Sequence, residues 1–383
     1  MFTFQVNGTL LQHFVNLFYQ LGIWGSDEES NFRKIGKKLT HTFYGALFPI
    51  FFATNALLCT DRNESIFSAQ AAIIVMVLYV KFSYLLFKKP EILAFLHDTI
   101  VVHSIENLDE YEHTNKKIKK FMGFVRPYCF AFFLTAPLII VLKLPIFSDD
   151  KVLPVFISLS WNDSEVIYWL AYTFVSLSTS LYVVVNLLTT LIWYIMLNYS
   201  IEYELVGNKL SRLGHKNART RGKMVKIQES FELPQRSMFV EELIVLIKAY
   251  RNLIITIERF TSCFTTLFLC QIVTSGIVIC ASVYNIAFSS NDNILQTELY
   301  VAILVYVFFD IFLVMYLANG ITVASDRLAY CFFESNWIEQ TQSCKKYVLI
   351  MGEAFKRPQR LVILIYPLNL ETFMTVSEGL ALS

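Results

Sequence analysis

The sequence predicts an all-α, polytopic membrane protein with about seven transmembrane helices and a cytoplasmic amino terminus. Three observations lead to this fold class. Of the 383 residues, 55% are hydrophobic and only 16% are charged, whereas a soluble domain carries about 25% charged residues. Long apolar segments recur along the whole chain. Lysine and arginine gather in alternate segments between them. Much of the protein surface is therefore expected to face the lipid bilayer.

Six apolar segments reach about 20 residues, the length that the hydrocarbon core of a bilayer requires. A seventh, Leu361–Leu382, is also apolar but carries Pro367, Glu371 and Glu378. The fourth and fifth segments exceed the minimum length, and we expect them to tilt or to project from the bilayer. The six clear segments are Leu39–Leu58, Ile66–Phe87, Phe121–Leu142, Val166–Leu197, Phe260–Phe288 and Leu299–Asn319.

The basic residues predict which connections face the cytoplasm. The leader and the second and sixth connections hold four, six and six lysines and arginines, and the fourth holds ten from Lys209 to Arg251, whereas the first, third and fifth hold one, two and none. The positive-inside rule places the first set in the cytoplasm. The amino terminus is then inside and, after seven spans, the carboxyl terminus is outside. Two glycosylation sequons, at Asn63 and Asn162, fall in connections that this topology places outside.

The cytoplasmic connections are long and are expected to be helical in part. Lys88–Lys120 is predicted to extend the second and third spans. Val240–Tyr250 has helical spacing and leads into the fifth span without a helix breaker. The polar stretch Gly214–Lys223 is the expected irregular point. The chain thus divides into a cytoplasmic leader (1–38), a ligand-binding part with six spans (39–320), and an anchor helix with the last span (321–383).

Catalytic chemistry has no support in the sequence. None of the six histidines lies in a recognised pair, and none of the seven cysteines forms a C-x-x-C pair. The nucleotide-binding G-x-x-x-x-G-K-[ST], the metalloprotease H-E-x-x-H and the hydrolase G-x-S-x-G patterns are absent from the sequence. We therefore predict no enzyme activity, metal, cofactor or nucleic-acid partner, and we expect the cysteines to be free thiols.

Ionisable residues inside a membrane span suggest a function. Asp310 lies near the middle of the sixth span, so it is a candidate for gating or for an ion path. A structural alternative is a hydrogen bond to a polar neighbour on another helix, such as Gln271 or Asn186, and both remain open. Lys81, near the cytoplasmic end of the second span, can extend its ammonium to the membrane surface.

Aromatic and hydroxyl side chains in the outer half of the third and fourth spans suggest a ligand pocket. Tyr168 and Tyr172 are four residues apart and share one helix face. The third span offers Phe133, Thr135 and Ile139. An apolar cavity with a few hydroxyls suits a small volatile or lipophilic ligand. An interfacial aromatic belt with ordinary packing is the alternative.

The last third of the chain carries family motifs. Tyr330 and Trp337 follow the sixth span, and Lys345 and Lys346 then precede an apolar helix. The chain ends through Tyr366-Pro-Leu-Asn-Leu-Glu-Thr-Phe373, and its leader contains Leu21-Gly-Ile-Trp24. These features resemble the insect odorant receptor family, as do the length and the predicted topology.

This resemblance implies a subunit of an odorant-gated, non-selective cation channel in the plasma membrane, expected in sensory-neuron dendrites. It implies a tetramer with a co-receptor subunit and a small volatile odorant as ligand. The last span would line the pore, with Phe373 and Val376 as candidate pore residues beside Asp310. Val240–Tyr250 and Trp337–Arg360 would belong to the cytoplasmic anchor. The connection between spans four and five indicates an odour-tuning subunit, because the co-receptor has a much longer one.

The end of the chain departs from the family pattern, and other receptor classes remain open. Ser377, Glu378 and Gly379 stand where an apolar last span would continue, which predicts a truncated form or an atypical pore end. A gustatory receptor of related fold would carry a Thr-Tyr…Gln-Phe pattern in its last span, and this pattern is absent here. A G-protein-coupled receptor would need an external amino terminus, against the charge pattern, and a transporter would need repeated halves.

Overall fold

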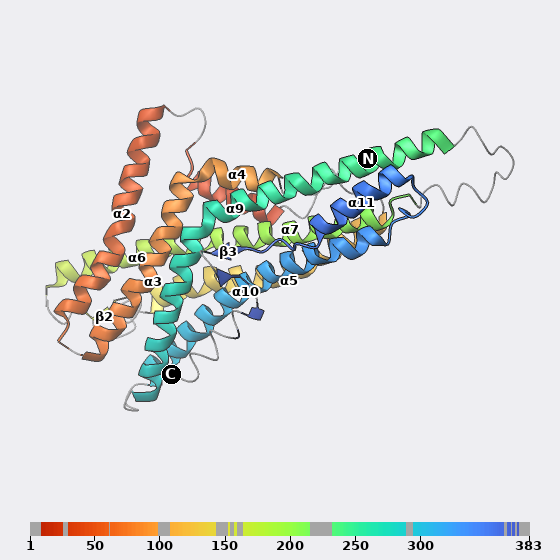
Figure 1. The fold of residues 1–383 in the computed structure, drawn as a ribbon. Helices are drawn as coiled ribbons and strands as arrows, with labels where there is room; N and C mark the ends of the chain where they lie inside the picture. The colour runs from red at the N-terminus through yellow and green to blue at the C-terminus, as the bar shows by residue number, and fades with distance from the viewer. Residues whose placement is uncertain are drawn as a thin grey trace.

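Long α-helices dominate the structure, a computed structural model (Figure 1). It describes residues 9–25, 30–60, 62–98, 108–142, 152–153, 157–158, 164–214, 232–288, 294–363, 366–368, 370–371 and 374. The elements are α1 (Thr9–Gln20), α2 (Asn31–Leu58), α3 (Arg62–Phe87), α4 (Lys89–Asp98), α5 (Leu108–Leu142), β1 (Val152–Leu153), β2 (Ile157–Ser158), α6 (Glu165–Val185), α7 (Leu187–Ser211), α9 (Glu232–Phe288), α10 (Ile294–Phe333), α11 (Gln342–Phe355), β3 (Val362–Ile363) and β4 (Tyr366–Pro367).

The six clear spans predicted from the sequence are all helical. The first, second, third, fifth and sixth lie within α2, α3, α5, α9 and α10, and the fourth runs through α6 and α7, which meet at Asn186. Within the described residues, four helical segments are long and apolar enough to cross a membrane by length and composition alone. These are Glu64–Phe87, Glu165–Ser211, Phe239–Ala287 and Tyr300–Phe333.

The predicted seventh span begins differently from expectation. Val362–Ile363 pairs with Tyr366–Pro367 in an antiparallel hairpin, and the Leu368 amide donates to the Leu361 carbonyl at 2.7 Å. The prediction of a helix from Leu361 was therefore wrong for residues 361–363 and 366–368. Pro367 has no amide hydrogen and disfavours a helical conformation in the residue before it, which explains the hairpin. Phe373 and Val376 lie outside the described residues.

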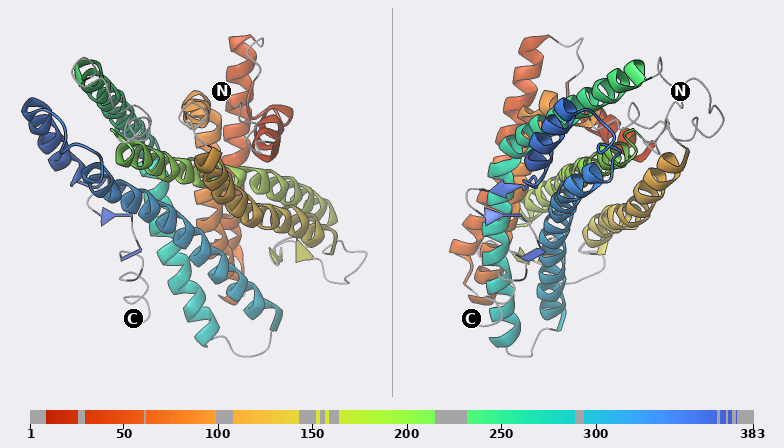
Figure 2. Two further views of the ribbon diagram at one scale, coloured as in Figure 1. Left: turned by 90° about the vertical axis from the view of Figure 1, so that its right-hand side faces the viewer. Right: turned by 45° about the vertical axis from the view of Figure 1, so that its right-hand side comes forward.

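The helix α7 lies at the centre of the bundle. All ten residues from Leu187 to Met196 are buried, and the helix packs along α10 and against α9. A helix that is apolar on every side is stable only where other helices surround it. The further views show α3 beside α2, α9 crossing α10, and α5 running with α6 on the other side (Figure 2).

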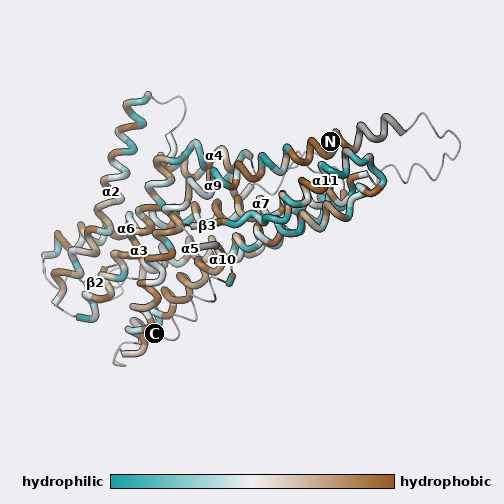
Figure 3. Tube along the Cα trace, in the orientation of Figure 1, coloured by the Kyte–Doolittle hydropathy of each residue, from teal (hydrophilic) through white to brown (hydrophobic). Residues whose placement is uncertain are grey.

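Several of these helices extend beyond the predicted spans. The prediction that Val240–Tyr250 continues into the fifth span is confirmed, because α9 is unbroken over 57 residues. The helix α5 likewise begins at Leu108, ahead of the third span, whereas α4 is a separate helix. Polar segments gather where α7, α10 and α11 lie together (Figure 3). There Arg212 donates to Glu110 at 2.6 Å, and Lys117 pairs with Glu204, which ties α7 to α5.

The close approach of α2 and α3 depends on Gly45. A Cβ atom at Gly45 would lie 2.9 Å from Cδ1 of Phe82, whose ring is fully buried. We expect Gly45→Ala to destabilise the protein by about 1–3 kcal/mol through overpacking, measured as a lower Tm of the purified protein. Gly36→Ala on the same helix has no atom of a described residue within 4 Å of its Cβ and should leave the Tm unchanged or raise it. An equal response of both variants would contradict the packing argument.

Candidate functional site

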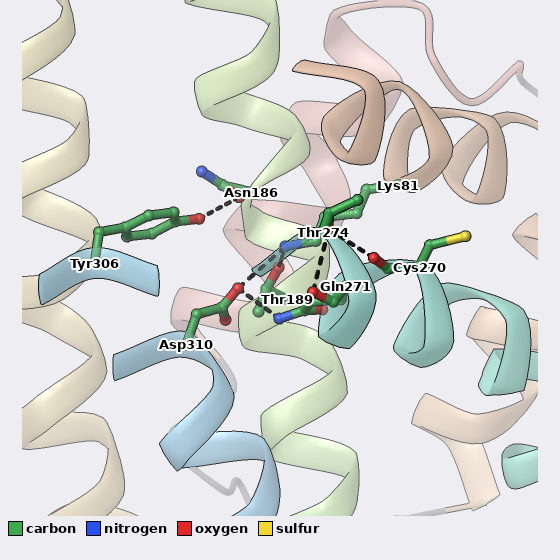
Figure 4. Close-up of polar contacts among 8 residues, drawn as sticks. All are labelled: Lys81, Asn186, Thr189, Cys270, Gln271, Thr274, Tyr306 and Asp310. Atoms are coloured by element: carbon green, nitrogen blue, oxygen red, sulfur yellow. Dashed lines mark hydrogen bonds and ion pairs between the residues drawn. The ribbon is translucent and has the colours of Figure 1, made fainter. Parts of the chain in front are cut away.

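A buried ion pair joins α3 to α10 in the middle of the bundle. Lys81 and Asp310 are 2% and 5% exposed, and the Lys81 Nζ lies 3.5 Å from Oδ2 of Asp310. Gln271 of α9 donates from Nε2 to the same carboxylate oxygen at 2.6 Å. Three helices therefore meet at one carboxylate (Figure 4).

The helix α7 contributes polar groups on the other side of the ion pair. The Lys81 ammonium donates to Oγ1 of Thr189 at 2.9 Å. One turn before Asp310 on α10, the Tyr306 hydroxyl lies 3.3 Å from Oδ1 of Asn186, at the junction of α6 and α7. We call Lys81, Asn186, Thr189, Gln271, Tyr306 and Asp310 the polar cluster. It links α3, α7, α9 and α10 deep in an otherwise apolar core.

The polar cluster decides two points that the sequence left open. The structure contains the predicted hydrogen bond between Asp310 and Gln271, whereas Asn186 binds Tyr306 instead. The expectation that Lys81 extends to the membrane surface was wrong, because its ammonium points inward to Thr189 and Asp310. An acceptor and an opposite charge at the bundle centre hold it there.

The polar cluster is costly to bury. Removing two charges from water carries a desolvation penalty of several kcal/mol per ion, which the ion pair offsets only when its hydrogen bonds are well made. The second carboxylate oxygen of Asp310, Oδ1, has no hydrogen-bond partner among the described residues. The arrangement is therefore poorly suited to a purely stabilising role. An ion pair of this kind suits a junction whose polar contacts change when the helices move.

The two tyrosines of the predicted ligand pocket lie together. Tyr168 and Tyr172 are 4% and 6% exposed, and their ring centroids are 6.1 Å apart. The Tyr172 hydroxyl donates to the Ile140 carbonyl of α5. The face of α6 that the sequence predicted is therefore buried and packs against the third span.

The other predicted pocket residues are placed differently. Phe133 is 40% exposed, and Thr135 is exposed and donates to the Ala131 carbonyl of its own helix at 2.8 Å. The Ile139 side chain lies outside the described residues. Phe133 lies on the same face of α5 as the buried Met122 and Cys129, but its own side chain stays exposed. The residue pattern did not indicate this, because the contact of α6 with α5 is made further along, at the Ile140 carbonyl.

Aromatic residues of α2 face α6, and the sequence analysis missed them. Phe174 of α6 meets the rings of Tyr44, Phe48 and Phe51 at centroid distances of 5.5, 6.0 and 5.9 Å. Phe48 also stacks on Tyr182 at 5.3 Å. Tyr44, Phe48 and Phe51 are spaced four and three residues apart along α2, which places them on one helix face. This spacing was the sequence signal that could have identified them.

The helix α11 has one buried and one exposed apolar side. Phe355 is 1% exposed and packs on Tyr250 of α9 and Phe332 of α10, with centroid distances of 4.8 and 5.2 Å. Its other side carries Tyr347, Leu349 and Ile350, which are 57–66% exposed. At its end, Lys356 donates to Glu353 at 2.9 Å and holds the pKa of that carboxyl below its usual value.

The fold and the site define a multi-pass helical membrane protein with a buried polar cluster and an exposed apolar side on α11. The sequence profile of the 7tm odorant receptor family matches residues 62–379. The chain therefore belongs to this family. The match favours the odorant receptor prediction over the gustatory and G-protein-coupled alternatives.

Relatives and solved structures agree with this family. The chain is 26% identical over 205 residues to Odorant receptor 94a and 25% identical over 192 residues to Odorant receptor 33b, both of Drosophila melanogaster. These alignments cover 53% and 49% of the chain and 48% and 45% of the relatives, about half of each length. The fold is similar to the insect olfactory receptor OR5 of Machilis hrabei in complex with eugenol, with a TM-score of 0.70, 13% identity and 97% of both chains covered. A second structure of that receptor gives a TM-score of 0.69 at 11% identity, again with 97% of both chains covered.

Proposed function

We propose that this chain is an odour-tuning subunit of an odorant-gated, non-selective cation channel in the plasma membrane of sensory neurons. The family match over residues 62–379 carries the proposal. The fold similarity along nearly the whole chain supports it. The cytoplasmic amino terminus, the three-part division of the chain and glycosylation at Asn63 and Asn162 belong to the same proposal. Asn63 lies in the first turn of α3, and Asn162 lies outside the described residues.

The ligand is proposed to be a small hydrophobic volatile that binds in the outer half of the bundle. Tyr168 and Tyr172 on α6 form one wall, with the α2 rings beside Phe174 next to them. Phe133, Thr135 and Ile139 would join this wall only if lipid or another subunit covers the outer end of α5. Each buried CH₂ group of a ligand adds only about 0.8 kcal/mol. Tuning to a range of ligand sizes is therefore expected.

Tyr168→Ala should change the rank order of odorants. The substitution removes a buried ring from the proposed wall and enlarges the space beside Tyr172. Larger ligands should gain relative to smaller ones by up to about tenfold, because a ring vacates the volume of several methylene groups. Dose–response curves over a homologous series measure this. Leu170→Ala, at a position that is 66% exposed on the same helix, is the control, and an unchanged order for Tyr168→Ala would remove this residue from the pocket.

The polar cluster is the proposed link between ligand binding and gating. It joins α9 and α10, whose inner ends both contact Phe355 of the proposed anchor. A ligand that binds better to the conformation with the last spans apart shifts the population toward it. Asp310 then acts in gating, and Phe373 and Val376 are the proposed pore residues.

The exposed side of α11 is the proposed contact with other subunits. Tyr347, Leu349 and Ile350 form an apolar surface on the anchor, of the kind that marks protein interfaces. We propose a tetramer in which a co-receptor subunit shares this anchor. The same surface would otherwise face the aqueous cytoplasm.

Calcium entry into cells that express the chain with and without an insect co-receptor tests this function. With an odorant panel, we expect responses only when both subunits are present. Responses without the co-receptor that depend on a G protein would contradict the channel proposal. Silence in both cases, despite confirmed delivery to the cell surface, would contradict the receptor proposal for this polypeptide.

A further inference from the structure

Two polar side chains on neighbouring helices are buried without a partner in the outer half of the bundle. Gln70 of α3 is 4% exposed and Ser282 of α9 is fully buried. Neither the amide of Gln70 nor the hydroxyl of Ser282 has a hydrogen-bond partner among the described residues. Nearly all buried polar groups in folded proteins are paired, because an unpaired one is costly. A partner from outside the described chain would remove this cost.

The helix register places these two residues at a similar level on two antiparallel helices. Tyr84 of α3 stacks on Phe264 of α9 at 5.8 Å, whereas Lys81 and Gln271 both reach Asp310. Lys81 precedes Tyr84 on α3, whereas Gln271 follows Phe264 on α9. The two helices therefore run antiparallel. Eleven residues outward from Lys81 is Gln70, and eleven residues outward from Gln271 is Ser282.

Eleven residues are close to three helical turns, or about 16 Å. Gln70 and Ser282 therefore lie on the same helix faces as the polar cluster and at one common level nearer the outside. The α9 face between the two levels is buried through Ser275 and Val278, as this periodicity requires.

Further residues define the surroundings of this level. Asn285, one turn beyond Ser282, has a buried amide nitrogen without a partner among the described residues. Phe67, one turn before Gln70, packs edge-on against Tyr300 of α10 at 5.9 Å. The region is therefore bounded by α3, α9 and α10. It is distinct from the tyrosine wall on α6.

We propose that Gln70 and Ser282 form a polar subsite for a neutral, oxygen-bearing small ligand, such as an alcohol or a carbonyl compound. The Gln70 amide offers two N–H donors and one acceptor, and the Ser282 hydroxyl offers one donor and an acceptor oxygen. A ligand hydroxyl can accept from one and donate to the other. Gln70, Ser282 and Asn285 are uncharged, so none of these three described residues supplies a counter-ion to a carboxylate or an ammonium ion. This inference rests on the proposed function and adds a second ligand-binding region, apart from the tyrosine wall, together with the chemical class of ligand that it takes.

Octanol, octanal and octane are the probes that separate hydrogen bonding from shape. The variants are Gln70→Met, which keeps an unbranched side chain, and Ser282→Ala. In cells with the co-receptor, we expect Gln70→Met to raise the half-maximal concentration for octanol and octanal about tenfold, equivalent to about 1.4 kcal/mol. Octane should shift less than twofold. Gln12→Met, at an exposed position of α1, is the control and should shift none of them.

The Tm of the purified receptor measures ligand binding independently of channel opening. Octanol should raise the Tm of the wild type more than that of Gln70→Met, with octane equal for both. If octanol and octane raise the Tm equally in the wild type and in Gln70→Met, the subsite proposal is overturned. Gln70 and Ser282 would then bind buried water or have a structural role. A channel that stays silent while octanol still stabilises the wild type in a Gln70-dependent way would retain the subsite and overturn only the channel proposal. If Gln70→Met does not fold, Ser282→Ala gives the same comparison.

Discussion

Asp310→Ala and Lys81→Met, each alone, are expected to prevent delivery of the receptor to the cell surface. Each substitution leaves the other charge buried and unpaired, which costs about 3–5 kcal/mol. This is a large fraction of the total stability of a domain. The Gln271 amide would also lose its carboxylate acceptor in Asp310→Ala. Surface biotinylation and size-exclusion profiles measure the effect.

The double variant Lys81→Met with Asp310→Leu provides the decisive comparison. Replacing a buried ion pair by apolar residues of similar volume is often neutral or stabilising, so we expect surface delivery to return. Odorant-evoked current should not return with surface delivery. The apolar pair would no longer give the junction between α3, α9 and α10 polar contacts that can change when these helices move. Normal current in the double variant would assign the pair a structural role alone. Normal delivery of both single variants would contradict the buried ion pair.

Tyr347→Asp combined with Ile350→Asp is expected to abolish assembly with the co-receptor. Both side chains are exposed in the single chain, at 66% and 57%, so the subunit itself should fold. Each apolar side chain buried at an interface contributes about 1.5–3 kcal/mol, and a buried aspartate adds a desolvation cost. Co-purification through a tagged co-receptor should fall at least tenfold.

Gln342→Asp is the matched control for this prediction. It introduces the same charge at an exposed position in the first turn of the same helix, where a negative charge is favourable. It should leave co-purification unchanged. Full assembly of the double aspartate variant would place the subunit interface elsewhere on the anchor.

The sequence predicted the helical architecture well, because the length of an apolar segment is a local property. The six clear spans coincide with helices, and the continuous helix through Val240–Tyr250 followed from periodicity without a breaker. The helix predicted at the start of the seventh segment was wrong, because the prediction followed the hydropathy of the segment and neglected the backbone restriction at Pro367. The hairpin at Val362–Ile363 and Tyr366–Pro367 depends on that local backbone restriction.

Partners far apart in the sequence were less predictable. Asp310 was recognised as unusual because a carboxylate in a membrane span is costly, and Gln271 was among its candidate partners. Lys81 was assigned to the membrane surface because its position near the end of a span allows this. Its actual partners, Thr189 and Asp310, follow from the packing of α3 against α7 and α10, which no local pattern encodes.

Current from outside-out membrane patches that contain this chain and a co-receptor tests the central claim most directly. The pipette solution would contain no GTP or other nucleotide. The account predicts a cation current that starts at once on odorant application and persists through repeated pulses, because the receptor is itself the channel. A response that requires GTP, or that is carried equally by the co-receptor alone, would contradict it.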